Sequence, residues 1–251
     1  MATISNTLFI GKVLIKLETV DSTNDYSKRL LSNSKPVEGT AIIAYQQHQG
    51  RGQYGNEWLS EPGSNLTFSI ILYPSFLHAN QQFGLTQAVA LGIVDTLQDI
   101  LDESIFIKWP NDIYCKGKKI AGILIENTLI GNQVGDSIIG IGLNVNQQDF
   151  SKLPQASSLS ILAGKKMDID ILLQALLTQL EKRYLQLRSG QVVILDNDYK
   201  ENLYRLNEKH WYKAAGEPFE GTIVGYDSYG RLLVQKDNVV LAFSNKEIEF
   251  L

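Results

Sequence analysis

Residues 108–126, KWPNDIYCKGKKIAGILIE, place a lysine, an indole, an amide and a carboxylate within five positions at the start of a predicted hairpin. Trp109 precedes a proline, and a residue before proline avoids the helical region. Asn111 and Asp112 therefore emerge at a fixed bend beside Lys108. A carboxylate and an amide on a stiff turn can hold Mg²⁺ together with phosphate oxygens, because this ion takes few protein ligands. Asn and Asp are also common in ordinary turns, and the letters alone favour that interpretation.

The same hairpin re-enters the predicted sheet at Lys119. Strict alternation puts Lys119 on one face with Ala121 and Ile123, and Gly122 on the other face, where the missing side chain leaves room for a bulky group. A ligand is one candidate for that group. A solvated lysine at a hairpin rim is the plain alternative for Lys119.

A second stretch, QHQGRGQYGNEW at residues 47–58, sets three glycines around Arg51 between two predicted strands. Such a loop can present N–H groups and a guanidinium to an anion, or act as a lid. It is not a P-loop, because no GK[ST] follows, and it is not a dinucleotide fingerprint, because Trp58 leads into a strand. A plain flexible loop is an equal alternative.

A third stretch, GIGLNVN at residues 140–146, also contains glycines. Gly140 and Gly142 lie inside a predicted strand, and Asn144 ends it. Glycine inside a strand usually marks a bulge or the close approach of another group.

Strand and helix signals alternate along most of the chain, which predicts an α+β domain with a mixed sheet. Strands are predicted at residues 8–18, 40–46, 65–73, 106–109, 113–127 with a turn at Lys116-Gly117, and 137–146. Helices are predicted after an N-cap at Ser22 or Thr23, and at residues 85–101, 168–188 and about 196–206. From Trp211 the pattern is all-β, which predicts a small barrel and a division into domains 1–208 and 209–251.

The composition limits the classes of function. With 251 residues, 44% hydrophobic and 20% charged, the chain can build one substantial domain and a small satellite. A net charge of −4 argues weakly against a nucleic-acid surface. Cys115 is the only cysteine, which excludes an intramolecular disulfide and a cysteine-based zinc site. No apolar run approaches the roughly 20 residues that span a bilayer, and no signal-peptide pattern opens the chain, so we expect a cytoplasmic protein.

The motifs together resemble those of biotin–protein ligases, in the same order, over roughly residues 8–250. The matching segments are DSTN at 21–24, QxxGRG at 47–52, Trp58, KWPND at 108–112, KxAGILxE at 119–126 and GxGxN at 140–144. The tail GTIVGYDSYGRLLV is similar to the small C-terminal barrel of that family. KWPND together with KxAGILxE is specific to the family, whereas the glycine loop alone is not.

This resemblance implies a catalytic domain like that of class II aminoacyl-tRNA synthetases and a C-terminal SH3-like barrel. It implies that biotin and Mg²⁺-ATP form biotinyl-5′-AMP and pyrophosphate, and that a lysine of a biotin carboxyl carrier domain then accepts biotin. Two anions meet in the first step, so cations and fixed dipoles are needed where charge develops. Water must be kept from the adenylate, which a closing lid over residues 48–56 would do.

The resemblance also assigns residues to roles. The implied catalytic residues are Lys119, Arg51 and Asp112, and Asp112 is the candidate side chain for Mg²⁺. The implied biotin-binding residues are Ser22, Thr23, Asn24, Gln47, Gly50, Arg51, Gly52, Gln53, Lys119, Gly122 and Gly142. The implied ATP-binding residues are Arg51, Trp58, Lys108, Asn111, Asp112, Lys119 and Asn144.

Two departures from the family pattern have consequences. Gln53 and Asn56 stand where family members commonly have arginine, so we expect the adenylate to be held less tightly, by roughly 10- to 150-fold if nothing compensates. The DSTN motif begins at residue 21, and the 20 residues before it are too few for the DNA-binding domain of some relatives. We therefore expect no DNA-binding role.

Three alternatives stay open at the level of sequence. A lipoate or octanoate ligase or transferase of the same fold is one alternative, although KWPND points away from it. A non-catalytic biotin-binding sensor is another, because the same residues bind and catalyse. The resemblance also leaves both a monomer and a homodimer open.

Overall fold

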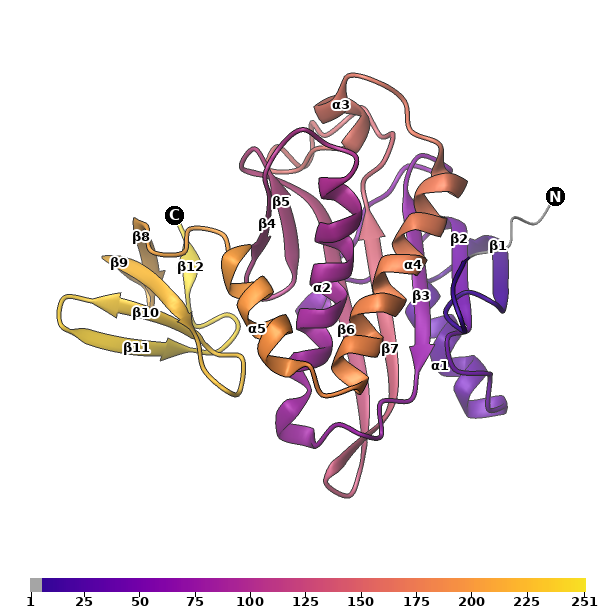
Figure 1. Cartoon of the computed structure of the whole chain (residues 1–251). Coiled ribbons are helices and arrows are strands. Elements are labelled where there is room, and N and C mark those ends of the chain that lie inside the picture. The colour runs from indigo at the N-terminus through magenta and orange to yellow at the C-terminus, as the bar shows by residue number, and fades with distance from the viewer. Residues whose placement is uncertain (1–5) are drawn as a thin grey trace.

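The computed structural model describes residues 6–251, which form two sheets (Figure 1). The larger sheet has seven strands in the order β1-β2-β3-β7-β6-β5-β4, with β1 and β2 parallel and the other pairs antiparallel. Its strands are β1 (Leu14–Val20), β2 (Ala41–Gln47), β3 (Leu66–Leu72), β4 (Ile105–Lys108), β5 (Asp112–Cys115), β6 (Lys118–Ile130) and β7 (Gln133–Leu143). The smaller, antiparallel sheet contains β8 (Lys209–Ala214), β9 (Glu217–Tyr226), β10 (Leu232–Lys236), β11 (Val239–Phe243) and β12 (Glu249–Phe250).

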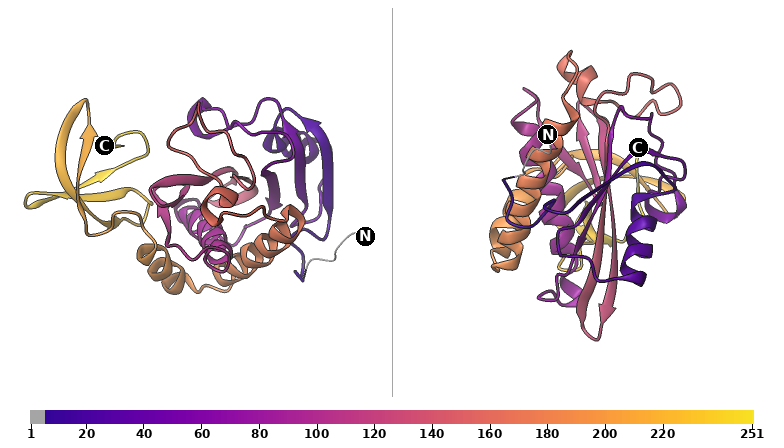
Figure 2. Two further views of the ribbon diagram at one scale, coloured as in Figure 1. Left: turned by 90° about the horizontal axis from the view of Figure 1, so that it is seen from above. Right: turned by 90° about the vertical axis from the view of Figure 1, so that its right-hand side faces the viewer.

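Helices cover both faces of the larger sheet (Figures 1 and 2). They are α1 (Thr23–Asn33), α2 (Phe83–Gln98), α3 (Leu159–Ala163), α4 (Ile169–Arg188) and α5 (Val192–Glu201), with 3₁₀ turns η1 (Gln53–Gly55) and η2 (Ala79–Gln81). Helices α2 and α4 pack together on one face, and α1 lies against β3 and β7 on the other. Gly92 allows the close approach of α2 to α4, because a Cβ there would lie 2.9 Å from the Cα of Leu180. No helix within residues 6–251 is both long and apolar enough to cross a membrane.

The predicted α+β class with a small C-terminal β unit is confirmed. The predicted turn at Lys116-Gly117 is also confirmed, with φ values of 50° and 71°. Ser22 is the N-cap of α1, although its hydroxyl makes no capping hydrogen bond. The predicted boundaries of three elements are wrong, because the first strand begins at Leu14, the strand predicted at 137–146 spans Gln133–Leu143 and the last helix spans Val192–Glu201.

The strict alternation predicted for residues 119–124 is also wrong. The pairing of β6 with β5 shifts by one residue between Lys119 and Ala121, which leaves Ile120 as the extra residue of a β-bulge. The bulge turns Lys119 to the same side of the sheet as Gly122, and both line one cavity. A one-residue shift moves a side chain to the opposite face, and the alternating pattern cannot reveal it.

One row of paired residues crosses the centre of the larger sheet and has glycine in the middle. The row runs through Lys108 on β4, Asp112 on β5, Gly122 on β6, Gly142 on β7 and Thr67 on β3. Residues directly opposite one another on neighbouring strands point to the same face. The two adjacent glycines therefore leave a hollow in that face, on the side covered by α1.

The smaller sheet is attached to the larger one by buried aromatic side chains. Trp109, which is 6% exposed, donates a hydrogen bond from Nε1 to the carbonyl of Gly230 at 2.8 Å. The rings of Phe83 and Tyr226 lie 5.1 Å apart, and the Tyr226 hydroxyl accepts a hydrogen bond from Gln87 at 2.8 Å. The first strand of the smaller sheet begins at Lys209. The division into domains 1–208 and 209–251 stays a prediction.

Replacing Trp109→Phe should weaken this attachment. The change removes one buried hydrogen bond and leaves the Gly230 carbonyl unpaired, so we expect a loss of about 1–3 kcal/mol in the free energy of unfolding. Urea unfolding followed by circular dichroism measures this loss. Trp211→Phe is the matched control, because Trp211 is 53% exposed on β8, and we expect less than about 0.5 kcal/mol there. Equal losses in the two variants would contradict the attachment.

Candidate active site

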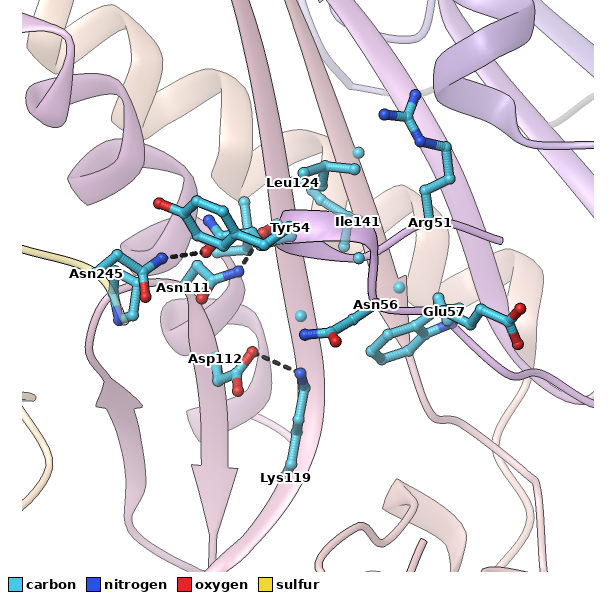
Figure 3. Close-up of a pocket in the computed structure, with 18 of the residues that line it drawn as sticks. Arg51, Tyr54, Asn56, Glu57, Asn111, Asp112, Lys119, Leu124, Ile141 and Asn245 are labelled. Carbon is cyan, nitrogen blue, oxygen red and sulfur yellow. Dashed lines mark hydrogen bonds and ion pairs between the residues drawn. The ribbon is translucent and has the colours of Figure 1, made fainter. Parts of the chain in front are cut away.

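A cavity of about 490 Å³ opens over the glycine hollow (Figure 3). It is enclosed by the glycine loop (residues 47–58), strands β5 to β7, the start of α1, and residues 245–250 of the smaller sheet. Most of the site residues expected from the sequence line it: Ser22, Thr23, Asn24, Gln47, Arg51, Gly52, Gln53, Trp58, Lys108, Asn111, Asp112, Lys119, Gly122 and Gly142.

Gly50 and Asn144 do not line the cavity, although we expected both to bind ligand. Gly50 closes the base of the glycine loop, where a Cβ would lie 2.4 Å from the backbone oxygen of Trp58. Asn144 is 4% exposed, and its side chain donates to the carbonyl of Ser157 at 3.0 Å. The two residues shape the backbone that carries their neighbours.

The start of α1 forms a polar cluster at one end of the cavity. The Thr23 backbone N–H donates to Gln47 Oε1 at 2.7 Å, and Asn24 Nδ2 donates to Glu126 Oε2 at 2.9 Å. The hydroxyl of Ser69 lies 2.7 Å from both Thr23 Oγ1 and Asn24 Oδ1. These bonds fix hydroxyl and amide groups at the positive end of a helix dipole, which suits a polar, uncharged or anionic ligand group.

The sequence analysis did not identify Ser69 as part of this cluster. Ser69 is fully buried in strand β3, LTFSIIL, in which all residues except Ser69 and Thr67 are apolar. A buried hydroxyl needs a hydrogen-bond partner, so a serine inside such a run is a signal that can be read from the sequence.

Trp58 fills the hollow above the two central glycines. A Cβ on Gly142 would lie 2.2 Å from the indole, and one on Gly122 would lie 3.0 Å from it. The bulky group beside Gly122 in this structure is therefore the Trp58 side chain. Among the described residues the buried Nε1 of Trp58 has no hydrogen-bond partner, so a polar ligand atom could satisfy it.

Lys119 and Asp112 form an ion pair at the centre of the cavity. Lys119 Nζ lies 2.6 Å from Asp112 Oδ1, and 5.5 Å from the centroid of the Trp58 ring. Both side chains are mostly buried, with exposures of 31% and 23%. An ammonium held by a carboxylate and a π-face, and still open to the cavity, can receive a ligand anion without a large change of position.

Lys108 lies beside this pair in a drier environment. Burial lowers the pKa of Lys108, although Asp112 acts in the opposite direction. Its ammonium lies 4.8 Å from the Tyr114 ring centroid and 4.9 Å from that of Phe250. Burial also raises the pKa of Tyr114 to about 12, so the phenol stays neutral near this lysine.

Arg51 points away from Lys119 and toward α1 (Figure 3). Its guanidinium forms ion pairs with Asp25 and with Glu126, the latter at 3.3 Å. Burial raises the pKa of Glu126, but hydrogen bonds from Lys28 and Asn24 outweigh it and the net shift is downward. A ligand anion that binds Arg51 therefore competes with the carboxylates of Asp25 and Glu126.

Residues of the smaller sheet that the sequence analysis did not identify complete the cavity. Asn245, Lys246, Glu249 and Phe250 line it. Asn245 Nδ2 donates to Gln53 Oε1 at 2.6 Å, which joins the glycine loop to the turn between β11 and β12. The two residues are 192 positions apart, and no local pattern in the sequence connects them.

The described residues contain no group of three or more His, Cys, Asp and Glu side chains that could hold a metal ion. Asp112 is available as a single carboxylate within the cavity. A magnesium ion that enters with a nucleotide would thus depend mainly on phosphate and water oxygens.

Gly142→Ala should displace Trp58 from the hollow. The added methyl group overlaps the indole, so we expect a loss of about 1–3 kcal/mol in unfolding free energy and a shift of the tryptophan emission spectrum. Gly122→Ala is the graded control, because its methyl group would meet the ring at 3.0 Å and needs a smaller adjustment. Identical spectra and stabilities for the two variants would contradict this packing.

Comparisons with known proteins agree with the geometry. A sequence model described as "Biotin/lipoate A/B protein ligase family" matches residues 17–144. A bifunctional ligase/repressor of Bacillus subtilis is 33% identical over 96% of this chain and 74% of its own length. A biotin–[acetyl-CoA-carboxylase] ligase of Paracoccus denitrificans is 28% identical over 87% of this chain and 92% of its own.

A solved structure has the same overall arrangement. The biotin protein ligase from Aquifex aeolicus in complex with biotin and ATP superposes with a TM-score of 0.79 and 27% identity, over 95% of this chain and 98% of that one. The family model covers just over half of the chain, and the Bacillus relative matches nearly all of it. The chain therefore belongs to the biotin/lipoate A/B protein ligase family.

Proposed function

We propose that this protein is an ATP-dependent ligase that activates biotin as biotinyl-5′-AMP and transfers biotin to a lysine of a biotin carboxyl carrier protein. The observation that carries the proposal is the central ion pair, Lys119 with Asp112, placed between a polar cluster and a π-surface in one cavity. Biotin and ATP in the related Aquifex structure supply the two ligands.

In the first step the carboxylate of biotin attacks the α-phosphorus of ATP. A bond forms between the carboxylate oxygen and phosphorus, and the bond to the bridging oxygen breaks, which releases pyrophosphate. Lys119 is our candidate for the cation that joins the two anions, because its ammonium faces the cavity. Fixed charge at this point stabilises the negative charge that develops on the phosphoryl oxygens.

The biotin end is assigned to the polar cluster at the start of α1. The cyclic urea of biotin offers one carbonyl acceptor and two N–H donors, and a hydroxyl or an amide can match either. Thr23, Asn24 and Gln47 supply such groups, and Ser69 holds two of them in place. Ser22 lines the same end. Gly122 and Gly142 add no side chains of their own to the floor, which the Trp58 indole covers.

The nucleotide end is assigned to Asn111, Asp112, Lys108 and Trp58. The indole offers a flat face and an unpaired N–H to a base. Mg²⁺ would arrive with ATP, and Asp112 is the candidate side chain for it. Asn144 lies outside the cavity lining, so we leave it out of this assignment.

In the second step the amine of a carrier lysine attacks the acyl carbon of the adenylate. An amide bond forms, the carbon–oxygen bond to AMP breaks, and the amine loses a proton. Asp112 is our candidate for positioning that amine. The glycine loop covers the cavity and would keep water from the mixed anhydride. A cytoplasmic location, and action without DNA binding, stay predictions.

The decisive experiment incubates the protein with biotin, Mg²⁺-ATP and an isolated carrier domain, and reads the mass of the carrier. We expect an increase equal to one biotinyl group, and no increase with lipoate or octanoate in place of biotin. Addition of lipoate or octanoate instead would identify the other activity of the fold. Biotin binding without any mass increase would identify a sensor.

Lys119→Ala should slow pyrophosphate release by at least about 100-fold, because it removes the cation between the reacting anions. Lys118→Ala, on the neighbouring residue, is the matched control, since the Lys118 ammonium bonds the carbonyl of Pro154 away from the ion pair. Circular dichroism should show that both variants fold. Near-normal pyrophosphate release by Lys119→Ala would show that the cation is assigned to the wrong residue.

Lys108 should set the alkaline limit of activity. Its pKa is lowered by burial, so its charge is lost at a pH below the ordinary value of a lysine, and ATP binding should weaken as pH rises through that lowered value. Lys108→Arg should move the alkaline fall to higher pH, because a guanidinium stays protonated. The pH profile of kcat/KM for ATP measures this shift. If the loss of activity at alkaline pH occurs at the same pH in both proteins, a group other than Lys108 causes it.

A further inference from the structure

The glycine loop and the turn between β11 and β12 make a second contact beside the Gln53–Asn245 hydrogen bond. The ammonium of Lys246 lies 4.2 Å from the centroid of the Tyr54 ring, which is within cation–π distance. Both side chains are exposed and both line the cavity. Neighbouring residues of the loop thus contact neighbouring residues of the turn at the cavity mouth.

Both partners of this second contact have a backbone conformation that favours glycine. The φ angle is 56° at Tyr54 and 70° at Lys246. A non-glycine residue in the left-handed region is disfavoured, and such residues cluster at sites where the side chain has a role. The two side chains that meet therefore both project from tight turns of the backbone.

Lys246 differs from the other cations of the cavity because it is exposed and no carboxylate holds it. Arg51 pairs with Asp25 and Glu126, and Lys119 pairs with Asp112. Lys108 is buried against aromatic rings. Within residues 6–251 Lys246 has no ion pair.

The carboxylates adjacent to Lys246 in the chain are engaged elsewhere. Glu247 accepts a hydrogen bond from the Ser244 backbone at 2.6 Å, and Glu249 pairs with Lys213 at 3.6 Å. Lys246 can therefore meet a ligand anion without displacing a carboxylate of the described residues.

After Arg51 the glycine loop has no positive charge to offer a nucleotide. Between Gly52 and Trp58 it carries no lysine or arginine, and Glu57 adds a negative charge. The polyphosphate of ATP is highly anionic and needs cations at its binding site.

We propose that Lys246, in the turn between β11 and β12, binds the β- and γ-phosphates of ATP in place of an arginine at position 53 of the glycine loop, and that the Gln53–Asn245 hydrogen bond positions it. This inference rests on the proposed function. It gives Gln53 a positioning role. It concerns the binding of ATP only, because the adenylate has no β- or γ-phosphate.

The test measures nucleotide binding by calorimetry without biotin, so that no adenylate forms. Lys246→Gln keeps the length of the side chain and removes its charge. We expect it to weaken ATP binding about tenfold and to leave AMP binding within about twofold, because AMP lacks the β- and γ-phosphates. Lys246→Arg should bind ATP within about threefold of the unaltered chain. Equal weakening for ATP and AMP, or no weakening, would overturn the proposal.

Lys236→Gln is the matched control. Lys236 also lies on the smaller sheet with its ammonium near an aromatic ring, 5.4 Å from the centroid of Phe219, but it does not line the cavity. We expect ATP binding within about twofold of the unaltered chain. A tenfold loss of ATP affinity in Lys236→Gln would mean that the overall positive charge of the smaller sheet attracts ATP, rather than the position of Lys246 at the cavity. That result would overturn the proposal.

Gln53→Arg provides a reciprocal test. Combined with Lys246→Gln, it returns a cation to the glycine loop, so it should restore most of the lost ATP affinity. Asn245→Ala, which removes the positioning hydrogen bond, should raise the KM for ATP about threefold or more and leave kcat and the KM for biotin unchanged. Failure of both expectations would overturn the positioning role.

Two failures can be told apart with the unaltered chain. If it does not biotinylate the carrier domain, the proposed ligase function fails, whatever Lys246 does. If it biotinylates the carrier and Lys246→Gln binds ATP as tightly as the unaltered chain, only the role of Lys246 fails.

Discussion

The active site depends on one constraint, the row of paired residues that places Gly122 beside Gly142 at the centre of the larger sheet. Two adjacent positions without side chains create a hollow in an otherwise packed surface, and Trp58 occupies it. The same row brings Asp112 beside Gly122, and a bulge turns Lys119 to that face. Register therefore determines which groups meet in the cavity, because directly paired residues share a face.

The second constraint is the attachment of the smaller sheet. Trp109 belongs to the same KWPND segment as Asp112, and its indole reaches Gly230 in the turn before β10. One short segment therefore presents groups to the cavity and also holds the unit that closes the cavity. The position of residues 245–250 over the site follows from this attachment, and with it the contacts of Asn245 and Lys246 with the glycine loop.

Two cations of the cavity are paired with carboxylates that a ligand anion can replace. Arg51 and Lys119 rest against carboxylates, whereas Lys108 is desolvated and Lys246 lies on a ring. Each paired cation is held in place by its carboxylate. It binds a ligand anion when that anion replaces the carboxylate. This arrangement suits a reaction in which two anions must be brought together.

The sequence by itself determined the α+β class, the all-β C-terminal unit and the turn at Lys116-Gly117, and most of the site residues expected from it line the cavity. These depend on local signals, namely apolar periodicity, glycine placement and short motifs such as KWPND. The tertiary structure alone decided the face on which Lys119 lies, the packing of Trp58 on Gly142, and the contacts of Asn245 and Lys246. A bulge changes a face without changing the letters, and a contact between residues 192 positions apart depends on how two sheets pack, which no local pattern encodes.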